Sequence, residues 1–392
     1  MINGFIPGKI AVLDTFRPEF PWVDVNGDEC PDIPHGEASI HYVKSGLKGD
    51  SEVIPFEVGE VVNNKGKLEE KISVGSILAQ LTKIEKRDDI THIALISNSG
   101  SDLSKYLSKE AKKELLDTRL EPPLTTDEIQ ENRNICRTEY KKTLTPNGEV
   151  KLFLKKLEDI GKTKNKKIFC CTGNYGKDYL GLNAMADNTT LVSYVDGAFK
   201  KHSLTTDNQF VDVFAKGVFE SRPIWRNGVI AGYDITEDGK IDVPIEQIAG
   251  YETIQKFQGK TAEEATASKK DYMEWFKKQK EMGTGSMEQG FKLFPQDKLI
   301  SMDILSDIGY VDKNPQFAGF YTEAKTLIDM FTCETDEDYK KHPKIFFKVQ
   351  NGKMVYDSPW KKKIYGASSG TPVALNQVYN EDVARARLNL KA

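Results

Sequence analysis

Lys9–Thr15 reads Lys-Ile-Ala-Val-Leu-Asp-Thr, a short apolar run that ends in a polar turn. Successive apolar positions of this kind are typical of a strand buried on both faces, as in a parallel sheet. Similar runs occur at Glu52–Val58 and His92–Ile96, and helical patterns at Gly36–Lys44 and Ile72–Ile84 separate them. This β-α-β order predicts an α/β fold with a doubly wound, mostly parallel sheet.

The alternation stops twice along the chain. A charged, helix-rich segment at about 102–148 is the first interruption, and a longer one covers 226–363. Between them the pattern resumes, with a helix predicted at Glu149–Ile160 and strands at Lys167–Cys171, Thr190–Val195 and Phe210–Ala215. We therefore predict a single large domain over 1–392 with two helical insertions, the second long enough to form a subdomain.

Composition limits the classes of partner. The 392 residues are 39% hydrophobic and 29% charged, which is typical of an ordinary globular protein, and the formal net charge is −4. Nucleic acid is not expected as a partner, because phosphate binding needs a basic surface. No apolar run approaches the roughly 20 residues that span a bilayer, so no membrane span is expected.

The N-terminus and the cysteines suggest a compartment. Residues 1–9 lack the basic and apolar regions of a signal peptide. The five cysteines are odd in number and irregularly spaced, which favours free thiols in a reducing compartment. We expect a cytoplasmic protein. Export by a route without an ordinary signal, or removal of a pro-segment to leave a mature form, stays open.

Gly366–Pro372 reads Gly-Ala-Ser-Ser-Gly-Thr-Pro and places serines between small residues before an apolar stretch. Small residues let a substrate backbone approach, and proline is tolerated in a first helical turn. The pattern suits a nucleophile at a helix start. It also fits the nucleophile elbow of α/β-hydrolases, where the order is Ser, Asp, His. No histidine follows Ser368, so that order is excluded and a histidine base must lie upstream.

Asp14 and His35 are the upstream candidates. Asp14 ends a predicted strand, at the edge where α/β sheets place their ligand sites, and His35 opens a predicted helix. Each alone has an ordinary explanation, since a strand-end aspartate often caps a turn. The competing histidines are His41, His92, His202 and His342.

The order Asp14, His35, Ser368 is that of subtilisin, and four motifs carry the similarity. Ile10–Thr15 resembles the strand that runs into the family's Asp-Thr/Ser-Gly, and His35–Ile40 resembles its His-Gly-Thr-x-Val-Ala. Gly173–Gly176 resembles the Gly-Asn-x-Gly oxyanion motif, and Gly366–Pro372 resembles Gly-Thr-Ser-x-Ala-x-Pro. The chain is similar to the subtilisin-like serine peptidases (subtilases), with Phe16 where glycine is usual.

Further similarities are weaker. Asn98–Gly100 resembles the family's Ser-x-Gly strand, and Val211–Gly217 resembles its Val-Asp-Ile-x-Ala-Pro-Gly segment, with Lys216 for proline. Glu37 stands where threonine is usual in the histidine motif. The resemblance covers about 1–101, 149–225 and 364–392, and leaves both insertions without a counterpart.

The resemblance implies a subtilisin-like three-layer sandwich and a serine endopeptidase that works through an acyl-enzyme. Ser368 would be the nucleophile, His35 the base, Asp14 its orienting carboxylate and Asn174 an oxyanion donor. The substrate would be a protein or peptide. Its binding would involve six residues at two strand ends: Asn98, Ser99, Gly100, Cys170, Cys171 and Thr172.

Other functions stay open at this point. The chain could be a catalytically silent subtilase-fold protein that binds a partner through its insertions, or a serine esterase or transacylase with the same triad. No cofactor is required. Subtilases often bind structural calcium, but the sequence places no metal site: neither Asp24–Asp28 nor Asp234–Gly239 meets the EF-hand pattern. The oligomeric state is not readable.

Overall fold

The computed structural model describes residues 7–49, 51–97, 102–106, 124–163, 166–261, 321–323, 343, 345–358 and 361–389. The chain divides into two compact units. The first contains Met1–Pro21, Pro34–Phe219 and Lys363–Ala392, and the second contains Trp22–Ile33 and Glu220–Lys362. The second unit thus holds most of the predicted insertion at 226–363 and, in addition, a short segment near the N-terminus.

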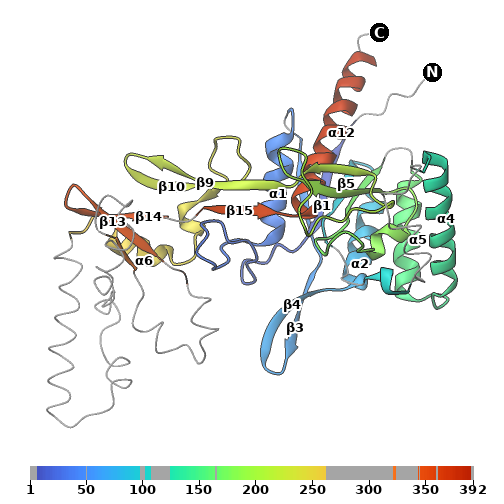
Figure 1. Cartoon of the computed structure of the whole chain (residues 1–392), viewed down its shortest axis with the longest axis horizontal. Coiled ribbons are helices and arrows are strands. Elements are labelled where there is room, and N and C mark those ends of the chain that lie inside the picture. The colour runs from blue at the N-terminus through green and yellow to red at the C-terminus, as the bar shows by residue number, and fades with distance from the viewer. Residues whose placement is uncertain are drawn as a thin grey trace. The chain divides into compact units, whose positions relative to one another are not determined.

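The first unit is built on a six-stranded sheet in the order β2-β1-β5-β6-β7-β8; β1 and β5 are labelled in Figure 1. Every neighbouring pair is parallel. The chain adds β2 on one side of β1 and the later strands on the other side. The order in which strands are added therefore reverses between β1 and β5. Ligand sites of α/β sheets lie beyond the carboxyl ends of strands at such a point. The strands are β1 (Lys9–Asp14), β2 (Val53–Glu57), β5 (Ile90–Leu95), β6 (Lys167–Cys171), β7 (Thr190–Val195) and β8 (Val213–Lys216).

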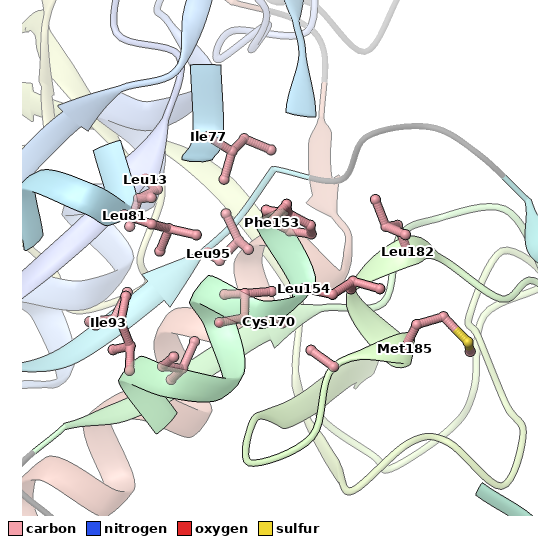
Figure 2. Close-up of a cluster of buried hydrophobic side chains, with 14 of the residues drawn as sticks. Leu13, Ile77, Leu81, Ile93, Leu95, Phe153, Leu154, Cys170, Leu182 and Met185 are labelled. Carbon is pink, nitrogen blue, oxygen red and sulfur yellow. The ribbon is translucent and has the colours of Figure 1, made fainter. Parts of the chain in front are cut away.

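Helices cover both faces of this sheet. Alternate side chains of a strand point to opposite faces, and β1 shows the division. Leu13 packs in one apolar cluster with Leu81 and Phe153 (Figure 2), whereas Val12 packs in another with Leu375. The predicted three-layer α/β sandwich with a parallel central sheet is confirmed. The helices of this unit are α1 (His35–Gly46), α2 (Val74–Glu85), α4 (Thr126–Lys142), α5 (Glu149–Gly161) and α12 (Ala367–Asn389).

Local signals explain where these helices begin. The side chain of Ser73 accepts the Ser76 N–H at 2.9 Å, and the Ser76 hydroxyl accepts the Ser73 N–H at 3.1 Å, which forms a capping box at the start of α2. The helix predicted at Ile72–Ile84 is confirmed within two residues. No helix among the described residues is long and apolar enough to cross a membrane.

A hairpin between β2 and α2 is absent from the sequence-based prediction. Its strands are β3 (Gly59–Asn64) and β4 (Lys67–Ile72), which pair antiparallel. Lys65 and Gly66 form the two-residue turn with φ of 54° and 92°. Two positive φ values match the twist of the flanking strands, as in a type I′ turn.

The described part of the second unit is mainly antiparallel. β9 (Val218–Arg226) pairs with β10 (Val229–Asp234), which pairs with β11 (Val243–Pro244). β12 (Tyr321–Glu323), β13 (Phe346–Gln350) and β14 (Lys353–Asp357) form another sheet, and α6 spans Tyr251–Phe257. Phe257, Phe347 and Tyr356 stack edge to face within this unit. Residues 262–320 of the predicted insertion lie outside the described residues.

A buried polar network ties α12 to the sheet of the first unit. His92 of β5 is fully buried, and its Nε2 lies 3.1 Å from Asp382 Oδ2. Lys167 Nζ lies 2.6 Å from the same oxygen, and the Tyr379 ring packs edge-on against His92. Burial lowers the pKa of His92 to about 4, although the Asp382 charge acts in the opposite direction. His92 is therefore neutral at pH 7.

Replacing Asp382 with alanine removes an acceptor that serves two buried or half-buried donors. We expect Asp382→Ala to lower the free energy of unfolding by about 1.5–3 kcal/mol, the usual contribution of hydrogen bonds to charged groups. Glu381 is the matched control, because it is an exposed carboxylate on the same helix, and Glu381→Ala should change stability by less than about 0.5 kcal/mol. Urea unfolding of the full chain measures both, and equal losses would contradict the assignment.

Candidate active site

Asp14 and His35 meet at the carboxyl end of β1. Asp14 is the last residue of that strand and is almost fully buried. The chain returns so that the Gly36 N–H donates to the Thr15 carbonyl over 2.8 Å, which places the start of α1 beside the strand end. His35 Nδ1 lies 2.8 Å from Asp14 Oδ2 and 3.0 Å from Oδ1. Two of the predicted site residues are therefore in direct contact.

Further donors orient the Asp14 carboxylate. Ser39 Oγ donates to Oδ2 at 2.9 Å, the Thr15 N–H donates to Oδ1 at 2.9 Å, and Ser97 Oγ lies 3.4 Å from Oδ1. The sequence analysis gave Ser39 no role. Its spacing offered a signal, because Ser39 follows His35 by one helical turn and so shares a face with it.

The Asp14 contact also sets the protonation of His35. Burial by itself lowers the pKa of His35, but the charge of Asp14 and the hydrogen bond to it outweigh that effect and raise the pKa above the ordinary 6.5. With Nδ1–H directed at the carboxylate, Nε2 of the neutral ring carries no proton. His35 is thus arranged as a base whose open nitrogen faces away from Asp14.

Asn174 and Ser368 both lie next to Gly366. Asn174 follows β6, and Ser368 lies in the first turn of α12. A Cβ built on Gly366 would lie 2.6 Å from Asn174 Nδ2 and 2.9 Å from Ser368 Oγ. The amide donor and the hydroxyl therefore border the same small space, which a side chain at position 366 would fill.

The first turn of α12 distinguishes the two adjacent serines. The Ser369 N–H and Gly370 N–H both donate to the Gly366 carbonyl, at 3.2 and 3.1 Å. Ser369 is buried, with 3% of its surface exposed, whereas Ser368 is only partly buried. Ser368 is thus the more exposed of the two serines, and its role as nucleophile stays a prediction.

The two pairs, Asp14 with His35 and Asn174 with Ser368, are not joined by a hydrogen bond. Within the described residues, His35 makes its side-chain hydrogen bonds to Asp14, and none connects His35 to Ser368. Catalytic hydrogen bonds in ligand-free enzymes are often long and tighten only when substrate binds. The geometry thus places the four groups at one edge of the sheet without a hydrogen bond between His35 and Ser368.

Of the six predicted substrate-binding residues, the structure describes Cys170, Cys171 and Thr172. Asn98, Ser99 and Gly100 lie outside the described residues. Cys170 is fully buried in the apolar cluster of Figure 2, so its side chain belongs to the core. Thr172 Oγ1 donates to the Val192 carbonyl at 3.2 Å. Burial raises the pKa of Cys171 to about 12, so its thiol is not a nucleophile at neutral pH.

The competing histidines are less suited to act as the base. His92 is buried against Asp382, as described above. His202 packs on the Tyr194 ring, and its Nδ1 accepts the Leu204 N–H at 3.2 Å. His41 lies on α1, six residues after the helix start at the strand end. His342 lies outside the described residues.

Three carboxylates in the second unit could hold a metal ion. Oxygens of Asp234, Asp238 and Asp242 lie within 4.8 Å of one another, the one such group among the described residues. Asp234 accepts backbone N–H groups of its own loop, Asp242 accepts the Ile235 N–H, and Asp238 pairs with Lys240 at 2.9 Å. These carboxylates already accept hydrogen bonds from protein groups.

The pKa of His35 tests the contact with Asp14. In a histidine-detected NMR titration we expect a midpoint above 6.5 for wild type, and a midpoint below 6.5 for Asp14→Asn, because burial remains when the charge is removed. A raised pKa also means that the ion pair stabilises the fold below pH 6.5 and that this contribution is lost as pH rises through the folded pKa. A wild-type midpoint at or below 6.5 would show that Asp14 does not face His35.

No protein-family model matches the chain, and no curated protein matches it. Solved structures similar to it include three proteases. A lanthipeptide protease is 13% identical, with 54% of this chain and 56% of that chain covered and a TM-score of 0.30. The subtilisin-like protease Apa1 from the Antarctic Pseudoalteromonas sp. AS-11 is 11% identical, with 55% and 42% covered and a TM-score of 0.28. The prenylagaramide maturation protease PagA is 14% identical, with 53% and 62% covered and a TM-score of 0.25. Each match thus spans less than two thirds of the other protein; all three are named as proteases, and one of them is named as subtilisin-like.

Proposed function

We propose that the chain is a divergent subtilisin-like serine endopeptidase. The observation that supports this most directly is the contact between the buried Asp14 and the partly exposed His35 at the carboxyl edge of a parallel sheet, where Ser368 and Asn174 border Gly366. An oriented base, an accessible hydroxyl and an amide donor are the parts that acyl transfer needs.

The reaction would begin with attack of Ser368 Oγ on the carbonyl carbon of a peptide bond. His35 Nε2 takes the hydroxyl proton as the new C–O bond forms, and Asp14 stabilises the resulting imidazolium. The imidazolium then gives its proton to the amine as the C–N bond breaks, which leaves an ester on Ser368. Water, deprotonated by His35, hydrolyses the ester and returns the enzyme to its starting state.

The carbonyl oxygen becomes negative during each attack. In this proposal Asn174 Nδ2 and the Ser368 backbone N–H donate to it. The positive end of the α12 dipole lies at the same place, because Ser368 is in the first turn of a helix 23 residues long. Fixed donors of this kind stabilise the transition state without reorganisation.

Covalent labelling tests the nucleophile. A fluorophosphonate probe should label wild type at Ser368 through the activated hydroxyl, and Ser368→Ala should abolish the labelling. Ser369→Ala is the control, and it should keep the label because Ser369 is buried. A folded wild type that stays unlabelled would instead identify a catalytically silent subtilase fold, and labelling that survives Ser368→Ala would show that another residue is the nucleophile.

Asn174→Ala tests the oxyanion donor. We expect kcat on a peptide substrate to fall about 10²–10³-fold with little change in KM, the loss known for one such donor in subtilisin. The reason is that the donor acts on charge that exists only in the transition state. Steady-state kinetics separate the two constants, and a rise in KM at constant kcat would assign Asn174 to ground-state binding.

A further inference from the structure

The carboxylate of Glu57 holds the turn that follows Asp14. Glu57 is the last residue of β2 and lies opposite Asp14 in the register of β1 and β2. Its Oε2 accepts the Phe16 N–H at 2.8 Å. Its Oε1 accepts the N–H of Gly59, the first residue of the β3–β4 hairpin, at 2.5 Å. One side chain thus connects the turn after β1 to the base of the hairpin.

Phe16 passes this restraint on to the start of α1. A Cβ on Gly36 would lie 2.6 Å from Cε1 of the Phe16 ring, so the ring packs against the backbone next to His35. The ring also packs on the apolar cluster between the sheet and α12. A shift of the Phe16 backbone would therefore move the ring on which the first turn of α1 rests. Through this contact Glu57 acts on the position of His35.

A second carboxyl group lies at the same glycine. Glu70 of β4 has 3% of its side chain exposed, and its Oε1 occupies the place that a Cβ on Gly59 would need. Both carboxylate oxygens are buried without a hydrogen bond, and so is Nε of Arg17, which lies 3.7 Å from Oε1. A buried carboxylate without hydrogen-bond partners is costly. Glu70 therefore favours its neutral form, and the Gly59 N–H is bound by Glu57.

The surroundings of Glu70 disfavour its charged form. Four charged groups from other elements act on it, three negative and one positive: Glu57 on β2, Asp14 on β1, and Arg17 and Glu19 in the turn after β1. The other charged residues of β3 and β4 lie on the opposite face of the hairpin: Glu60, Lys67, Glu69 and Lys71. Burial raises the pKa of Glu70 to about 7; the Glu57 charge adds to this effect and Arg17 opposes it. Glu70 thus exchanges its proton near neutral pH.

We propose that Glu57 is a positioning residue for the Asp14–His35 pair, and that the proton on Glu70 keeps Glu57 in place. The carboxylate of Glu57 is the acceptor that fixes the turn between Asp14 and the start of α1, and Glu70 is the group that can disturb it. The inference concerns a contact within the fold, so it does not depend on the proposed peptidase function.

The proton acts by keeping one charge away from another. When Glu70 is neutral, Glu57 holds the Phe16 N–H without a competing charge beside it. When Glu70 gives its proton to solvent, two carboxylates lie at the same backbone amide and repel each other. The bond from Phe16 to Glu57 then weakens, and the Phe16 ring moves from the backbone beside His35. Rising pH thus loosens the support of His35.

Exchange of the Phe16 amide proton measures its bond to Glu57. Corrected for the intrinsic rate, its protection in the wild type should be at least about tenfold higher at pH 6 than at pH 8. Glu70→Gln is uncharged at both pH values and should keep the protection at both. Glu69→Gln is the matched control, because Glu69 lies on the other face of β4, and it should behave like the wild type. Equal protection of the wild type at the two pH values, or a loss that persists in Glu70→Gln, would overturn the inference.

A double-mutant cycle tests the path to His35. Glu57→Ala and Phe16→Ala should each lower the NMR titration midpoint of His35 by at least about 0.5 pH unit, because the contact with Asp14 loosens. If Glu57 acts through Phe16, the double variant should show no further fall, whereas a direct effect of the lost Glu57 charge would add to that of Phe16→Ala. Additive shifts, or an unchanged midpoint in Glu57→Ala, would rule out the positioning role. Neither measurement needs activity, so a failure of Ser368 labelling would overturn only the peptidase proposal.

Discussion

The buried carboxylate of Asp14 is the constraint on which the site depends. A charge at the end of a buried strand is tolerated only when other groups hydrogen-bond to it. Ser39, Thr15 and His35 supply those bonds, and they fix where α1 begins. Gly36 permits the arrangement, since a Cβ there would lie 2.6 Å from the Thr15 carbonyl oxygen. The need to satisfy one carboxylate thus places His35.

Close backbone approach likewise places Ser368, the proposed nucleophile. The Gly366 N–H donates to the Gly217 carbonyl at 2.9 Å, which brings the start of α12 against the end of β8. A Cβ on Gly217 would lie 2.5 Å from the Gly366 carbonyl oxygen, and one on Gly366 would strike Asn174 and Ser368. Glycine at both positions therefore lets α12 start next to Asn174, the proposed oxyanion donor.

The sequence predicted the parallel strands because strands buried on both faces read as continuous apolar runs, as at Ile10–Leu13. It did not predict the β3–β4 hairpin, whose strands are largely exposed and charged and whose turn depends on Lys65 in a left-handed conformation. The hydrogen bonding of Asn183 was equally hidden. One of its partners, the Ser97 carbonyl, is 86 residues away in the chain, and no local pattern records a contact that only the folded sheet creates.

Two Asp–His pairs in one unit show why contact alone does not make a base. In the pair of His92 and Asp382, burial dominates and Lys167 shares the carboxylate, so the pKa of His92 falls to about 4. In the pair of His35 and Asp14 the carboxylate outweighs burial, and the pKa rises. His92 also sits near the start of β5, whereas His35 follows the end of β1. Of these two histidines, only His35 combines a raised pKa, partial exposure and a position at the edge where Ser368 lies, so environment rather than pairing separates the proposed base from the structural histidine.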